Sequence, residues 1–235
     1  MKFKILSALI LLTFSFSNTG NAQSADEIID KHIKAIGGAE KLSALKSVIL
    51  EAKVNAQGME IPMTMTTVQN KGWRMDISLM GMNGWMVMRP DSGWVFMPFQ
   101  GQTKPEAMPQ DAIKEGLSQL DIQGVLLDYK KKGHEVSYLG LDDVEGTECH
   151  KLKLTTKEGT VNYFLIDPAS SLIVKTINKR KAGGQEMEVE SLLSNYKDVD
   201  GYMMAHTITS QMGPLEIVKI TINPEIPASK FSMSE

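Results

Sequence analysis

Two long stretches of the sequence alternate apolar and polar residues with a period of two. In "SVILEAKV", which begins at residue 47, Val48, Leu50, Ala52 and Val54 fall on one side of an extended chain. The pattern continues between short segments rich in Gly, Asn, Asp and Pro, which are typical of turns. Consecutive strands joined by short turns pair antiparallel. The expected strands lie at about 46–56, 61–69, 72–80, 83–89 and 93–99, and again at 134–141, 147–156, 159–166, 171–180, 185–197, 202–212 and 215–222.

Helices are expected at two places. "SADE" at 24–27 has the pattern of a capping box, and Gly37 and Gly38 supply a left-handed stop. A second helical region is expected over 109–133, either as one helix or as two helices broken by Gly116 and Gly124. Its apolar stripe consists of Ile113, Leu117, Leu120 and Leu127.

The predicted fold is therefore of the α+β class, with one long antiparallel sheet of about eleven strands. A helix precedes the sheet and helices are inserted midway. An open sheet of this length curls, which creates a concave face that the helices can cover. That face is either closed core or a cavity.

The first 22 residues have the pattern of a secretory signal peptide. Lys2 and Lys4 precede an apolar run at 5–16, and Gly20 and Ala22 have the spacing of a cleavage site. We expect cleavage after Ala22, a mature chain that starts at Gln23, and export to the periplasm. The apolar run is shorter than the roughly 20 residues of a membrane-spanning helix.

Cysteine content and charge exclude several classes of function. Cys149 is the one cysteine, so neither a disulfide framework nor a cysteine-based metal site is expected, and no lipid is attached at the cleavage site. The formal net charge is −3, with Lys and Arg spread along the chain. This pattern gives no basic patch for nucleic acid.

Several short segments resemble the LolA/LolB-like family of periplasmic lipoprotein carriers and their receptors. "GWRMDI" at 72–77 followed by "PDSGWVFMPFQGQ" at 90–102 resembles the family's "FRW" and "DGKTLWxYxPxxxQ" strands. "YFLIDPASSLIVKT" at 163–176 is similar to its strand, Asp-Pro turn and strand. "YKDVDGYMMAHTI" at 196–208 and "INPEIPASKFSM" at 222–233 resemble the closing strands of its wider relatives.

This resemblance implies one half-barrel domain over residues 23–235. In the family, an incomplete barrel of about eleven strands is lidded by helices, and its apolar interior accepts acyl chains. A basic residue in the turn before the "FRW" strand influences lipoprotein release in the carriers. The nearest residue here is Lys71, which carries an ammonium group in place of a guanidinium.

Methionine is concentrated in the first half of the predicted sheet, where residues 59–108 hold ten of the 16 methionines. Methionine packs without fixing one shape and is frequent on surfaces that adapt to varied ligands. These residues are either loosely packed core or the lining of an acyl-chain site, and the resemblance favours the lining. If strands 72–80, 83–89 and 93–99 form one wall, the predicted ligand-binding residues are Trp73, Met75, Ile77, Met86, Met88, Trp94 and Phe96.

No pattern of a catalytic or metal site is present. His32, His134, His150 and His206 are scattered, and Cys149 and His150 are strand neighbours that point to opposite faces. No nucleophile elbow, zinc-binding helix or P-loop occurs. We therefore expect a non-enzymatic periplasmic carrier or chaperone without cofactor or metal. Its partners would be the acyl chains of lipids or lipoproteins, and envelope membrane proteins, but not nucleic acid. The alternative is a non-catalytic envelope interaction module with a closed core and no lipid ligand.

Overall fold

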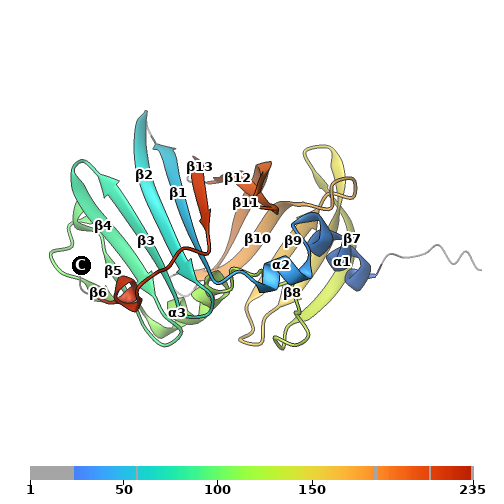
Figure 1. Cartoon of the computed structure of the whole chain (residues 1–235), viewed down its shortest axis with the longest axis horizontal. Helices are drawn as coiled ribbons and strands as arrows, with labels where there is room; N and C mark the ends of the chain where they lie inside the picture. The colour runs from blue at the N-terminus through green and yellow to red at the C-terminus, as the bar shows by residue number, and fades with distance from the viewer. Residues whose placement is uncertain (1–23, 57, 183–184, 212, 234–235) are drawn as a thin grey trace, which may run out of the picture.

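The structure is a computed structural model, and it describes residues 24–56, 58–182, 185–211 and 213–233. The signal peptide predicted over residues 1–22 lies outside these residues. In the described part of the chain, thirteen strands form one sheet in the order β6-β5-β4-β3-β2-β1-β13-β12-β11-β10-β9-β8-β7 (Figure 1). The strands are β1 (Ser47–Ala56), β2 (Met59–Val68), β3 (Gly72–Leu79), β4 (Met82–Met88), β5 (Gly93–Phe96), β6 (Glu106–Ala107), β7 (Glu135–Val144), β8 (Thr147–Thr155), β9 (Val161–Ile166), β10 (Ile173–Ala182), β11 (Gln185–Val199), β12 (Tyr202–Ser210) and β13 (Gly213–Ile222).

Helices occur at the start, the middle and the end of the described chain. Helix α1 begins after Ser24, whose hydroxyl accepts a hydrogen bond from the amide of Glu27, so the predicted capping box is present. The middle segment holds a short α-helix and a 3-10 turn, and another 3-10 turn follows β13. The helical elements are α1 (Ala25–Ala35), α2 (Ala39–Ser43), η1 (Pro98–Gln100), α3 (Gln110–Gly116), η2 (Leu117–Leu120) and η3 (Ala228–Phe231).

Every paired strand runs antiparallel to its neighbour. The first strand, β1, pairs with the last, β13, so that Val48 lies opposite Ile222. Three of the hairpins have two-residue loops in which both residues have positive φ, the geometry of turns that match the twist of a hairpin. These loops are Met80–Gly81, Glu145–Gly146 and Asp200–Gly201. Strands β6 and β7 remain at the two edges, so the sheet is open and not closed into a barrel.

The predicted α+β class and the long antiparallel sheet are confirmed, with three local corrections. The strand pattern missed β6, because two residues are too few to show alternation. The strands predicted at 72–80 and 83–89 are joined one residue earlier, by a turn at Met80 and Gly81, where Met80 adopts a φ of 52° that is unusual for a non-glycine residue. The predicted second helix of the middle segment does not form, and residues 121–133 are a series of turns in which Gly124 has positive φ.

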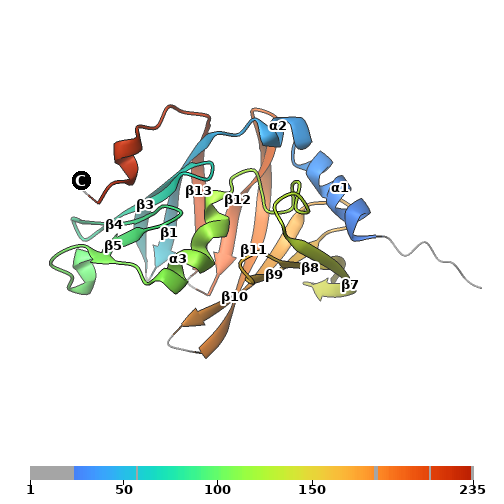
Figure 2. The same cartoon turned by 90° about the horizontal axis from the view of Figure 1, so that it is seen from below.

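The sheet has two different faces. We call the face against which α1, α2, α3 and residues 117–127 pack the inner face, and the other the outer face; Figure 2 shows the two halves of the sheet on either side of α3. The main core lies on the inner face, where Ile28, Ile29 and Ile33 of α1 meet Leu152, Leu154 and Ile166 of β8 and β9. On the outer face, Phe231 of η3 packs against Trp85 and Val87 of β4.

Candidate functional site

A row of apolar side chains crosses the inner face at right angles to the strands. Directly opposite residues of an antiparallel pair share a face, so the register places one apolar residue from each strand in line. All of them are half-buried. In order across β13, β1, β2, β3, β4 and β5, the row is Ile220, Leu50, Met65, Met75, Met86 and Val95.

Helix α3 covers the neighbouring row on one side. Trp73 lies opposite Met88, and both pack against Ile113 of α3 and Leu120 of η2. Met88 is only 2% exposed. This part of the inner face is core, and Met88 and Trp73 belong to it.

The strands continue on the other side of the row. There Met63 lies opposite Ile77, and Ile77 lies opposite the buried Gly84, over which the side chains of Met97 and Phe99 pack. Beyond them, Met59 and Met82 are 41% and 38% exposed. The inner face of β2–β4 therefore changes along the strands from core under α3, through the part covered by Met97 and Phe99, to exposed methionines at the strand ends.

Five of the seven predicted ligand-binding residues share the inner face, and two do not. Trp73, Met75, Ile77, Met86 and Met88 lie together, but Trp94 pairs with Val87 and Phe96 pairs with Trp85, on the outer face. The prediction that Trp94 and Phe96 share the methionine wall was wrong. The connection between Met88 and Gly93 has four residues, so even-numbered residues of β4 lie opposite odd-numbered residues of β5.

The outer-face aromatic residues form a separate cluster under the C-terminal segment. Trp85 contacts Phe96 with ring centroids 6.1 Å apart, and the Arg74 guanidinium lies over Trp85 at 5.1 Å. Arg74 also forms an ion pair with Asp76. Asp76 forms a second ion pair with Lys230, which precedes Phe231 in the chain. This cluster fastens the C-terminal segment to the sheet.

An apolar cavity of about 250 Å³ lies on the inner face between α1 and strands β9 and β10. Residues 123–127 close one side of it. Its apolar walls include Ile33, Ile36, Leu127, Phe164 and Ile173. Asn162, Asn178 and His32 are the polar side chains that α1, β9 and β10 contribute.

His32 is held in one orientation at this cavity. Its Nδ1 lies 2.9 Å from the carbonyl oxygen of Ser171, and the side chain is 4% exposed. A carbonyl only accepts hydrogen bonds, so Nδ1 carries the proton and Nε2 is the free acceptor. Burial lowers the pKa of His32, which keeps the imidazole neutral.

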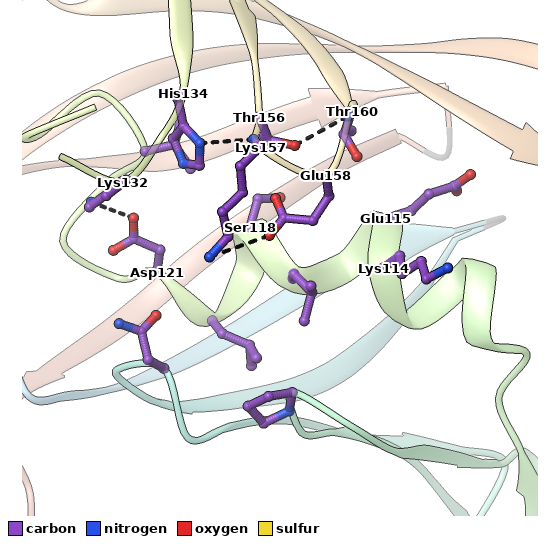
Figure 3. A pocket seen from close by; sticks show the side chains of 15 residues that line it. Lys114, Glu115, Ser118, Asp121, Lys132, His134, Thr156, Lys157, Glu158 and Thr160 are labelled. Carbon is purple, nitrogen blue, oxygen red and sulfur yellow. Dashed lines mark hydrogen bonds and ion pairs between the residues drawn. The ribbon is translucent and has the colours of Figure 1, made fainter. Parts of the chain in front are cut away.

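A second, polar cavity of about 330 Å³ adjoins the first between η2 and the β8–β9 turn (Figure 3). Lys132 pairs with Asp121, and Asp121 also accepts a hydrogen bond from the amide of Gln69 at 2.8 Å. His134 Nδ1 accepts a hydrogen bond from the backbone N–H of Lys157. Burial lowers the pKa of His134. The cavity wall thus combines an imidazole that accepts a hydrogen bond with paired charges.

The titratable groups of the described chain do not assemble into a nucleophile–base pair. Cys149 is buried on the outer face with Leu165 and Ile177, and burial raises the pKa of its thiol. His150 faces inward, where its Nδ1 lies 3.1 Å from the Tyr138 hydroxyl. Cys149 and His150 therefore point to opposite faces, as alternation predicts. Among the described residues, no group of three or more His, Cys, Asp or Glu is placed to hold a metal ion.

The cavities themselves were not predicted from the sequence. Asn162 and Asn178 become neighbours only through the β9–β10 register, and His32 reaches them from α1. The one available sequence signal was the pair of asparagines at inward positions of two apolar strands. Lys71, the basic residue singled out before β3, lies exposed in the β2–β3 turn.

Comparison with models of protein families and with curated protein sequences gives no match. Solved structures do match. A LolA superfamily protein from Nitrosomonas europaea aligns with a TM-score of 0.56 and 14% identity, over 89% of this chain and 97% of that one. A domain assigned to outer membrane lipoprotein sorting, from Vibrio parahaemolyticus, aligns with a TM-score of 0.53 and 16% identity, over 87% and 94%. A DUF1329 family protein from Desulfovibrio piger aligns with a TM-score of 0.50 and 12% identity, over 89% and 98%.

These likenesses define the class of fold. The chain has the fold of LolA superfamily proteins, so the resemblance noted in the sequence is confirmed at the level of the fold. Within the described residues, no helix is both long and apolar enough to cross a membrane.

Proposed function

We propose that this protein is a periplasmic carrier or chaperone that binds the acyl chains of lipids or lipoproteins on the inner face of its sheet. The proposal includes a signal peptide over residues 1–22, one domain over 23–235, and no catalytic activity. Sequencing of the exported protein is expected to start at Gln23. Retention of Met1 would contradict the proposed export.

The half-buried row Leu50–Met65–Met75–Met86–Val95 carries the proposal. A row of this kind in a closed core would be covered as Met88 is covered by α3. Instead, the apolar surface continues toward Met59 and Met82 with increasing exposure. Continuous exposed apolar surface is a recognised feature of ligand-binding grooves, and methionines adapt to chains of different shape.

The fold supports the proposal. The structure from Vibrio parahaemolyticus is assigned to lipoprotein sorting and shares this architecture. The alternative, an envelope interaction module with a closed core, predicts that α3 and residues 121–133 leave no room for an alkyl chain beside Met75 and Met86. The two readings therefore differ in one measurable property, saturable binding of a single alkyl chain.

Tryptophan quenching by a brominated fatty acid tests this property. Trp73 lies on the inner face, whereas Trp85 and Trp94 lie on the outer face. We expect saturable quenching in the wild type, and we expect Trp73→Phe to lose most of the quenching. Binding of the same acid by Trp73→Phe, measured by calorimetry, should persist.

Met86→Asp is the matched site variant, because it places a charge in the half-buried row. Met233→Asp is its control, because Met233 is 52% exposed after η3. We expect Met86→Asp to fold cooperatively and to bind at least tenfold more weakly, and Met233→Asp to bind as the wild type does. Absence of saturable binding in the folded wild type would leave the closed-core alternative.

A further inference from the structure

The polar and apolar cavities adjoin along one wall of the inner face. Both are lined by Ser118, Asp121 and Val125. The polar cavity lies at the β8–β9 turn, and the apolar cavity lies further along β9, under α1. A ligand that occupied both would pass beside the Asp121–Lys132 ion pair.

Thr160 and the strand β9 that follows it line the two cavities in turn, and their inner face changes in polarity along the chain. Thr160, Asn162 and Phe164 occupy alternate positions, so their side chains lie on the same face. Thr160 lines the polar cavity together with Thr156 (Figure 3), whereas Asn162 and Phe164 line the apolar one. Along one line the wall therefore passes from hydroxyl and charged groups, through an amide, to an aromatic ring.

Asn162, in the middle of this line, lies beside a second asparagine on the neighbouring strand. Asn178 of β10 lies directly opposite Asn162. Asn162 is 6% exposed, and Asn178 is half-buried. Within the described chain, neither side-chain amide makes a hydrogen bond, although the buried Thr156 hydroxyl nearby accepts one from the N–H of Thr160.

Two such amides leave hydrogen-bonding capacity directed into an apolar cavity. Their polar atoms stay accessible from the cavity, because among the described residues the one fully buried side-chain N or O atom without a partner is Trp85 Nε1. The amides face space bounded by Phe164, Ile173 and Ile33. A ligand with a carbonyl acceptor at this depth would receive hydrogen bonds from the two NH₂ groups, while its alkyl chain contacted the apolar walls.

From this arrangement we infer that the two cavities bind a singly acylated amphiphile, with Asn162 and Asn178 hydrogen-bonded to its ester or amide link. The polar head lies in the cavity of Figure 3, and the single chain runs past Phe164 and Ile173 beneath α1. This inference rests on the proposed carrier function, and it places a single-chain ligand under α1, apart from the methionine row. A volume of about 250 Å³ is at the small end of ligand cavities and suits one alkyl chain rather than several.

The charges of the polar cavity restrict the head group. Its lysines are Lys114, Lys132 and Lys157, and its acidic residues are Glu115, Asp121 and Glu158. Lys132 pairs with Asp121 and Lys157 with Glu158. Because the two signs balance, the site suits a zwitterionic head better than a strongly anionic one.

The test compares two probes that differ in one carbonyl group. One is a lysophosphatidylethanolamine with a 14-carbon chain in ester linkage, and the other is its ether analogue of equal chain length. We expect the wild type to bind the ester about tenfold more tightly, since only the ester offers an acceptor to the amides. In Asn162→Leu the ratio should fall to about one, and Asn178→Leu should reduce it.

Asn83→Leu is the control, because Asn83 lies exposed on β4 at an outward position, opposite Ser78. It should keep the tenfold ratio. An ester-to-ether ratio near one in the wild type would overturn the inference, as would a ratio that persists in both folded asparagine variants. These outcomes leave the proposed function intact if the brominated fatty acid still binds, whereas failure of the fatty acid and both lysolipids to bind would overturn both.

Discussion

Gly116, the last residue of α3, lies directly against the side chain of Met88 on β4. A Cβ at position 116 would come within 2.6 Å of the Met88 sulfur and 3.1 Å of its Cε. The absence of a side chain at residue 116 therefore lets helix α3 approach Met88 closely on the inner face. This contact marks the boundary between the covered and the open parts of the methionine surface.

At position 116, a small side chain should change stability little and a large one should destabilise the protein. The Met88 thioether is flexible at its tip, so Gly116→Ala should change the free energy of unfolding by less than about 1 kcal/mol. Gly116→Leu should cost about 1–3 kcal/mol through overpacking, measured by urea unfolding. In a Met88→Ala background the cost of Gly116→Leu should fall, because the two sites then share space. Equal costs in both backgrounds would show that α3 does not rest on Met88.

The C-terminal segment should contribute strongly to stability through Phe231. A Cβ on Gly72 would meet the Phe231 ring at 2.5 Å, so this ring lies flat against β3. Phe231→Ala should cost about 3–5 kcal/mol and expose Trp85, which is 3% exposed. The measurement is urea unfolding together with tryptophan emission, which should shift to longer wavelength. As a control, Met233→Ala should leave both unchanged.

From the sequence, the residues that share a face within one strand were easier to predict than the register between neighbouring strands. Alternation alone placed Trp73, Met75 and Ile77 on one face, and the structure agrees. The faces of Trp94 and Phe96 depend instead on the number of residues between Met88 and Gly93, and a shift of one residue exchanges the faces.

Long-range contacts were beyond the reach of local patterns. Nothing in the residues of β1 indicates that its second neighbour is β13, at the other end of the chain. The Asn162–Asn178 pair likewise needs the β9–β10 register, in which a bulge lies between Ile173 and Lys175. Glycines at 116 and 124 did indicate that the middle segment is broken, but not that residues 121–133 form turns over the core.

Acidification should destabilise the protein through His32. Its pKa in the folded state is lowered by burial, whereas the unfolded value is about 6.5. Above that value neither state binds the proton, and as the pH falls below it the unfolded state takes up the proton first, so stability decreases. The loss of unfolding free energy between pH 7.5 and 5.5 should be smaller in His32→Gln than in the wild type. His134 and His150, whose pKa values are also lowered by burial, remain in both proteins, so an equal loss would assign the effect to them.

Affinity for saturated fatty acids should increase with chain length in a regular way. Each buried CH₂ contributes about 0.8 kcal/mol, so the dissociation constant should fall about fourfold per added carbon from 10 to 14 carbons. The decrease should stop once the chain covers the half-buried row that includes Met86. In Met86→Asp the dependence on chain length should be weaker, because a chain that passes the aspartate desolvates its charge. Calorimetric titration of the series measures these slopes. A wild-type slope near zero would show that the alkyl chain stays in water and that the half-buried methionines are not its binding surface.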